Sequence, residues 1–251
     1  MTDKFNKIYQ ESIQNPEKFW QNVSEDIFWF KKPTKILNKS KPPFYKWFED
    51  GVTNTCYNAI DTHIDQGKGD KIALIYDSPI TNKKAKFTYK ELREKISKFA
   101  GALDNQGIKK GDRVIIYMPM IPEAVIAMLA CGRIGAIHSV VFGGFASNEL
   151  ASRIDDSKAK ILITASCGFE PGRTVEYRPL VDGALKLAKH KVEKVIFFQR
   201  EGNEVKLNSP LEISWEESLI NAKDKDCVEI GANEFAYILY TSGTTGIPKG
   251  I

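Results

Sequence analysis

The sequence predicts an α/β fold, a doubly wound, mostly parallel sheet with flanking helices, preceded by an N-terminal wrapping segment. From about residue 70 onward, short apolar runs alternate with runs whose apolar residues recur at helical spacing. That alternation is typical of βαβ units. Continuously apolar runs such as "RVIIYM" suit strands that are covered on both faces. We therefore expect residues 1–65 to form a brace segment and residues 66–251 to form the first part of one large, incomplete domain.

The N-terminal segment has its own composition. It holds three of the four tryptophans, Trp20, Trp29 and Trp47, together with many lysines and prolines. The run "NPEKFWQNV" predicts a short amphipathic helix, and the prolines of "KKPTKILNKSKPPF" predict extended chain. The tryptophans favour an ordered brace or lid over the larger domain. An ordinary N-terminal extension is the alternative.

The remaining elements follow the apolar pattern in chain order. In "FTYKELREKISKFAGALDNQGI", Thr88 and Glu91 form a capping box, and Gly107 is expected to end the helix. Ser214 and Glu217 form a second box before "WEESLINA". The charged runs "TNKKAKF" and "KDKDC" are expected in solvated loops. The other elements are strands at 71–77, 112–118, 137–142, 159–165, 192–198 and 235–240, and helices at 122–135, 148–156 and 180–188.

Composition and charge exclude several classes of protein. The net charge of +4, from 36 basic and 32 acidic residues, gives no reason to expect a nucleic-acid partner, and an anionic small molecule fits equally well. The four cysteines form no CxxC pair, so a zinc knuckle is not expected, and Cys131 is interpreted as a small core residue. The N-terminus lacks a secretory signal and carries early acidic residues, and no apolar run is long enough to cross a membrane. These features predict a cytoplasmic protein.

The run "YTSGTTGIPKG" near the end of the chain predicts a phosphate cradle. It follows a predicted strand, and ligands of open α/β sheets bind outside the carboxyl ends of strands. Glycines allow a tight turn whose N–H groups converge on an anion, hydroxyls donate to phosphate oxygens, and a lysine adds positive charge. The run is no Walker A loop, because Pro248 precedes the lysine and Gly250 follows it. The alternative is a surface loop. The cradle residues are Thr241, Ser242, Gly243, Thr244, Thr245, Gly246 and Lys249.

The same run resembles the phosphate-loop signature of the adenylate-forming superfamily. The stretches "YQESIQNPEKFW", "PPFYKWFEDGVTNTCYNAIDTHI" and "VVFGGFASNELASRIDDSKAKILITAS" resemble the N-terminal half of the acetyl- and propionyl-CoA synthetases. "SCGFEPGRTVEYRPLVDGAL" is more similar to the propionyl branch, because Glu170 stands where the acetyl branch has an arginine. The resemblance implies ATP, Mg²⁺ and coenzyme A as cofactors. It implies activation of a short-chain carboxylate, propionate or acetate, to an acyl-adenylate and then to an acyl-CoA.

The resemblance also implies roles for single residues. The cradle residues would bind the β- and γ-phosphates of ATP, with Thr241 the candidate for contact with Mg²⁺. Arg173 would contact a CoA phosphate, whereas Glu170 cannot. Gly143 and Gly144 would lie near CoA, although a tight turn is an equal alternative. His138 is expected to be a hydrogen-bonded histidine at a strand end, with a catalytic role as the alternative.

The resemblance finally implies what is missing. The motifs that read adenine and ribose, and the catalytic lysine of a small C-terminal domain, would lie beyond residue 251. We therefore expect residues 66–251 to be the first part of an AMP-binding domain, partnered by the missing C-terminal portion and inactive alone. Another adenylate-forming ligase and a non-catalytic truncated paralogue remain alternatives.

Overall fold

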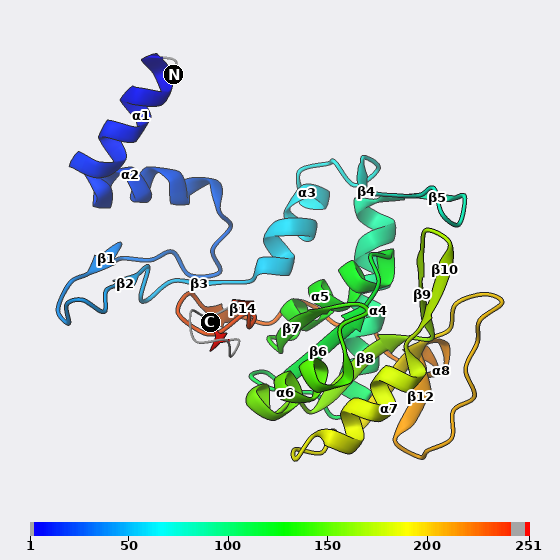
Figure 1. Cartoon of the computed structure of the whole chain (residues 1–251). Coiled ribbons are helices and arrows are strands. Elements are labelled where there is room, and N and C mark those ends of the chain that lie inside the picture. Colours follow the sequence, from blue (N-terminus) through cyan, green and yellow to red (C-terminus); the bar gives the residue numbers. More distant parts are fainter. Residues whose placement is uncertain (1–2, 242–248) are drawn as a thin grey trace.

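A computed structural model describes residues 3–241 and 249–251 of the chain (Figure 1). Its centre is a parallel sheet of five strands in the order β12-β11-β8-β6-β7. The crossovers from β6 to β7 and from β8 to β11 run in opposite directions, so the sheet is doubly wound as predicted. The strands are β6 (Arg113–Met118), β7 (Ile137–Phe142), β8 (Ile161–Ala165), β11 (Lys194–Phe198) and β12 (Glu212–Ser214).

Helices cover both faces of this sheet. One layer contains α4 (Tyr89–Asn105), α5 (Pro122–Arg133) and α8 (Trp215–Leu219), which pack on one another. The opposite layer contains α6 (Ser147–Ser157) and α7 (Arg178–Leu187). Right-handed crossovers in opposite directions place the layers on opposite faces. Apolar side chains from both layers and from the strands form one core, with Tyr117, Phe99 and Phe197 among its largest fully buried members.

The capping signals in the sequence are confirmed. The Thr88 hydroxyl accepts from the backbone N–H of Glu91, and the Glu91 carboxylate accepts in return from Thr88. Ser214 and Glu217 make the same reciprocal pair at the start of α8. The α4 helix ends where Gly107 takes a φ of +84°, a conformation that favours glycine.

One predicted loop is wrong. The run "TNKKAKF", expected in solvent, supplies most of β5 (Lys83–Thr88), which pairs antiparallel with β4 (Ile72–Ser78) outside the parallel sheet. Along β5 the lysines are exposed, whereas Ala85 and Phe87 are half-buried. Charged and apolar residues therefore alternate, which suits a strand with one face on the core and one in water.

The predicted strand at 235–240 also differs from the structure. Only Tyr237 bridges to β7, through His138, and the N–H of Ile238 donates to the His138 carbonyl at 2.9 Å. Leu239 instead exchanges two backbone hydrogen bonds with Ile251, and β14 (Tyr240–Thr241) pairs with β15 (Lys249–Gly250). The segment does not continue along β7, because its backbone N–H and C=O groups pair instead with residues 249–251.

The N-terminal segment joins the sheet domain through its later residues, of which Cys56 and Ile60 belong to the hydrophobic core. Its α1 (Asp3–Gln14) and α2 (Pro16–Val23) bury no residue and stand away from the sheet in Figure 1. The helix at α2 was predicted and α1 was not. Attachment comes from β3 (Val52–Thr53), which pairs with β13 (Ile230–Gly231), and from the Asn54 amide, which donates to the Gly132 and Val228 carbonyls at 2.9 Å. The boundary at residue 65 stays a prediction.

Replacing Gly101 by alanine is expected to destabilise the protein by about 1–3 kcal/mol, because an added methyl overpacks the core. A Cβ atom there would lie 1.9 Å from the carbonyl oxygen of Lys223. Gly132, also in a helix, is the matched control, since its nearest neighbour would be 3.9 Å away. Urea denaturation should show a lower midpoint for Gly101→Ala and an equal or higher one for Gly132→Ala. Equal midpoints for Gly101→Ala and the wild type would contradict the packing argument.

Candidate functional site

The turn after β7 lies at the carboxyl edge of the sheet, next to the tyrosine rings at 117 and 177. A Cβ atom on Gly143 would lie 2.1 Å from Tyr177 Oη and 2.8 Å from the Met118 carbonyl oxygen. Gly144 has a φ of +96°, and its N–H donates to Tyr117 Oη at 3.2 Å. Close packing and backbone conformation thus both require glycine. The tight-turn role of the pair is confirmed, and its contact with CoA stays a prediction.

Arg173 lies on a hairpin at the same edge, formed by β9 (Cys167–Glu170) and β10 (Arg173–Glu176). Its guanidinium donates to Glu170 Oε2 through Nη2 at 2.6 Å and Nε at 2.7 Å. The other carboxylate oxygen of Glu170 lies 3.9 Å from the position of a Cβ on Gly144. The structure therefore brings Arg173, Glu170 and Gly144 together. An anion that binds Arg173 must compete with Glu170, in a pair whose arginine side chain is 69% exposed.

The two ends of the predicted phosphate cradle lie side by side. Thr241 and Lys249 are register partners in the β14–β15 hairpin, and both are exposed. Ser242, Gly243, Thr244, Thr245 and Gly246 lie outside the described residues. The two ends of the loop, Thr241 with its hydroxyl and Lys249 with its ammonium group, therefore lie next to each other.

The α6 helix anchors this hairpin. Tyr240 Oη donates to Asp156 Oδ2 at 2.7 Å, and the guanidinium of Arg153 lies 5.1 Å from the centre of the Tyr240 ring. Burial and the neighbouring Asp156 carboxylate raise the pKa of Tyr240 well above its usual value, so the phenol remains a donor. The residue directly before Thr241 is therefore fixed to the helix that follows the Gly143 turn.

His138 differs from its expected role. Its ring borders an apolar cavity of about 580 Å³ between β4, α5, β7 and the segment 237–239. Nδ1 is buried and has no hydrogen-bond partner among residues 3–241 and 249–251, so the expectation of a hydrogen-bonded histidine fails for that atom. Burial lowers the pKa of His138 to about 4. The ring of Tyr237 lies beside the imidazole, with 5.8 Å between the ring centres, and a catalytic role for His138 stays an alternative from the sequence.

Acid should weaken the fold through this histidine. The unfolded chain binds the proton near pH 6.5, whereas the folded chain holds His138 neutral down to a pKa of about 4. The contribution of the neutral imidazole to the free energy of unfolding is therefore complete above pH 6.5 and is lost as the pH falls toward 4, by about 3 kcal/mol. Urea denaturation across this range should show a shallower pH dependence for His138→Gln than for the wild type. Parallel curves would contradict the burial of this imidazole.

A second cavity, of about 970 Å³, lies between the β4–β5 hairpin and the loops after β6 and β11. Lys83, Arg200, Glu123 and Glu201 contribute charges of both signs to its lining. The Arg200 guanidinium lies 4.8 Å from the centre of the Phe169 ring. Sequence reasoning missed this cavity because it placed the lysines of β5 in a loop. The alternation of charged and apolar residues in "KAKF" was the available signal.

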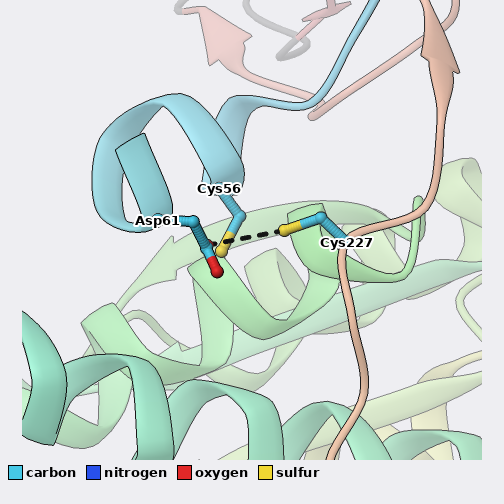
Figure 2. A group of neighbouring side chains, drawn as sticks. All are labelled: Cys56, Asp61 and Cys227. Carbon is cyan, nitrogen blue, oxygen red and sulfur yellow. Dashed lines mark hydrogen bonds between the residues drawn. The ribbon is translucent and has the colours of Figure 1, made fainter. Parts of the chain in front are cut away.

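Sequence reasoning also missed a buried polar cluster (Figure 2). Cys56, Asp61 and Cys227 place their sulfur and carboxylate atoms within 4.8 Å of one another. Arg133 lies among them, with Nη1 at 2.8 Å from Asp61 Oδ2, 3.1 Å from Cys227 Sγ and 3.6 Å from Cys56 Sγ. The run "KDKDC" is a loop as predicted, but its cysteine is half-buried rather than solvated. No local pattern joins residues so far apart in the chain.

Two family models match the chain. Residues 61–251 match the model described as AMP-binding enzyme, and residues 5–59 match the model described as acetyl-coenzyme A synthetase N-terminus. The two matches confirm the resemblance that the sequence motifs indicated.

No helix in the described part of the chain has both the length and the apolar character that crossing a bilayer requires.

Individual relatives agree with these models. The chain is 55% identical over 244 residues to the human acyl-CoA synthetase short-chain family member 3, mitochondrial, covering 97% of this chain and 36% of that protein. It is 43% identical over 254 residues to the acetyl-coenzyme A synthetase of Xylella fastidiosa, covering 98% and 39%. The acetoacetyl-CoA synthetase structure from Streptomyces lividans superposes with a TM-score of 0.85 at 25% identity, covering 96% of this chain and 37% of that one. The chain thus spans well under half the length of these relatives.

Proposed function

The chain belongs to the family of AMP-binding enzymes, and from this membership we propose that its protein activates a short-chain carboxylate with ATP and transfers the acyl group to coenzyme A. The carboxylate would attack the α-phosphate of ATP, releasing pyrophosphate and leaving an acyl-adenylate. The CoA thiolate would then displace AMP. On its own, the 251-residue chain is proposed to be inactive.

The observation that carries the proposal is the pairing of Thr241 with Lys249. A hydroxyl and an ammonium group emerge from adjacent strands at the base of one glycine-rich loop, and hard oxygen ligands and fixed cations suit a polyphosphate. Lys249 would hold the β- and γ-phosphates, and Thr241 would orient its hydroxyl toward them. A bound Mg²⁺ would neutralise phosphate charge, and Thr241 is the described residue proposed to contact it.

The second half of the reaction would use the opposite part of the carboxyl edge. Arg173, at the hairpin tip, would contact a phosphate of CoA after exchanging its partner Glu170 for that anion. Gly144 leaves room for a ligand beside Arg173, since among the described residues the nearest non-neighbouring atom to a Cβ placed there is Glu170 Oε1, at 3.9 Å. These residues bind and orient, and none of them transfers a proton.

The acid substrate is proposed to be propionate, with acetate as the second candidate. The support is the propionyl-like stretch around Glu170, whose carboxylate replaces an arginine of the acetyl branch. A cytoplasmic location stays a proposal, and the human relative is named mitochondrial.

Product analysis tests this proposal. The 251-residue chain and the product of its complete reading frame are each incubated with ATP, Mg²⁺, CoA and either propionate or acetate. We expect the complete product to form AMP and acyl-CoA in equal amounts and the 251-residue chain to form neither. ADP in place of AMP would contradict the proposed chemistry, and turnover by the chain alone would contradict its inactivity. A reading frame that stops at Ile251, with no activity, would favour the non-catalytic paralogue.

Replacing Arg173 by alanine in the active product should raise the KM for CoA about tenfold, the loss of one charge-assisted hydrogen bond. Carboxylate-dependent ATP–pyrophosphate exchange should not change, because CoA takes no part in that step. Arg93→Ala, at an exposed position on α4, is the matched control. An unchanged KM for CoA in Arg173→Ala would exclude Arg173 as a CoA contact.

A further inference from the structure

The Cys56–Cys227 pair has no part in the proposed reaction. Cys56 begins the turn into η2 (Tyr57–Asp61), and Cys227 lies in the loop that leads to β13. Their side chains point toward one another in Figure 2, and Arg133 Nη1 of α5 contacts both sulfur atoms. Their sulfur atoms lie within 4.8 Å. A disulfide would require the two sulfur atoms to move closer, to a separation of about 2.0 Å.

The backbone already holds the two cysteines in place. Thr53 of β3 pairs with Ile230 of β13, and each cysteine lies three residues beyond this pair on its own segment. The Asn54 amide donates to the Val228 carbonyl at 2.9 Å, and its carbonyl oxygen accepts from the N–H of Cys56 at 2.8 Å. A disulfide between the two sulfur atoms would therefore join two segments that the backbone already holds side by side.

Charge in the cluster favours thiol chemistry over metal binding. Arg133 Nη1 contacts both sulfur atoms and the Asp61 carboxylate, so a guanidinium occupies the position that a metal ion would take. The hydrogen bond from the Cys227 thiol, together with Arg133, lowers the pKa of Cys56 despite its burial. The same hydrogen bond and burial raise the pKa of Cys227. Cys56 is thus the more acidic thiol of the pair, and the Cys227 thiol donates to Asp61 Oδ2 at 3.7 Å.

We propose that Cys56 and Cys227 are a redox modification site, which hydroperoxides convert into an intramolecular disulfide. The Cys56 thiolate attacks a peroxide oxygen, the O–O bond breaks, and hydroxide leaves, giving a sulfenic acid at Cys56. The Cys227 sulfur then attacks the Cys56 sulfur. The S–S bond forms, the S–O bond breaks, and the departing hydroxide takes the Cys227 proton. In total, two thiols and one hydrogen peroxide give one disulfide and two waters.

Access to the pair comes through Cys227, which is half-buried in a loop without regular structure, whereas Cys56 is fully buried. The proposal requires local opening of this loop, which would let a molecule as small as hydrogen peroxide reach Cys56. The resulting disulfide would bind the N-terminal segment covalently to the loop that precedes the phosphate cradle. It would add a covalent link beside the paired strands β3 and β13.

Mass spectrometry of the folded protein tests the proposal. After treatment with hydrogen peroxide and blocking of free thiols, we expect loss of two of the four thiols and a cross-linked peptide pair containing Cys56 and Cys227. Cys131 is the internal control, because burial raises the pKa of its thiol to about 12, and it should remain free. The melting temperature should rise by about 5–10 °C on oxidation and return with a thiol reductant.

Variants separate the two chemical steps. In Cys227→Ser, oxidation should stop at the sulfenic acid of Cys56, which dimedone traps, and the melting temperature should not rise. Cys131→Ser should still form the disulfide. Four free thiols after peroxide, a disulfide between another pair or between molecules, or a wild-type Cys56 over-oxidised without cross-linking would each overturn the proposal.

Discussion

Replacing Asp61 by asparagine is expected to lower the free energy of unfolding by about 3–5 kcal/mol, because removing one partner leaves a buried charge without compensation. The Asp61 carboxylate accepts from Arg133 at 2.8 and 3.1 Å, and the arginine side chain is 3% exposed. The hydrogen bonds to Asp61 raise the pKa of Arg133 although burial opposes its charge, so the guanidinium cannot escape by losing its proton. Denaturation in urea measures the loss.

Asp65→Asn is the matched control for this variant. Asp65 lies four residues further along, in α3 (Thr62–Asp65), and is exposed, with a hydrogen bond from Tyr57 Oη at 2.8 Å. Exposed polar pairs contribute about 0–1 kcal/mol, so this control should lose little. Equal losses in the two variants would show that burial of the Asp61–Arg133 pair is not the cause.

Replacing Lys249 by alanine is expected to reduce the rate of carboxylate-dependent ATP–pyrophosphate exchange by about 10²–10³, the effect of removing one preorganised charge from a transition state. The expectation rests on the proposed function, since Lys249 and Thr241 are paired at the base of the predicted phosphate loop. The assay uses the product of the complete reading frame. Lys186→Ala, at an exposed position on α7, should keep the wild-type rate. If Lys249→Ala catalyses the exchange as fast as Lys186→Ala, Lys249 is excluded as a contact of the ATP phosphates.

Local signals predicted most of the sheet and its helices. The capping boxes at Thr88 and Ser214 and the apolar run of β6 act over a few residues, so their meaning depends little on the rest of the chain. The β5 strand was missed because its lysines outweigh two apolar residues. The predicted strand at 235–240 failed because its apolar pattern does not say whether β7 or the strand's own hairpin will pair with it.

In the candidate site too, features set by neighbouring residues were predicted from the sequence, and features set by distant residues were not. For Gly143 the sequence left a tight turn and a place near CoA as equal alternatives, and the packing of this residue against Tyr177 explains the turn. The ion pair between Arg173 and Glu170 depends on the register of a hairpin that was not predicted from the sequence. The cluster of Cys56 and Cys227 joins segments that are adjacent only after folding, so no spacing rule could have found it.

Carboxylate-dependent ATP–pyrophosphate exchange tests the central claim most directly. The product of the complete reading frame is incubated with ATP, Mg²⁺ and labelled pyrophosphate, with propionate, with acetate and with no acid, and CoA is left out. The proposed function predicts label in ATP only when a carboxylate is present, with propionate giving the faster exchange. Exchange that requires CoA, or no exchange with either acid in a product that spans the length of its relatives, would contradict adenylate formation.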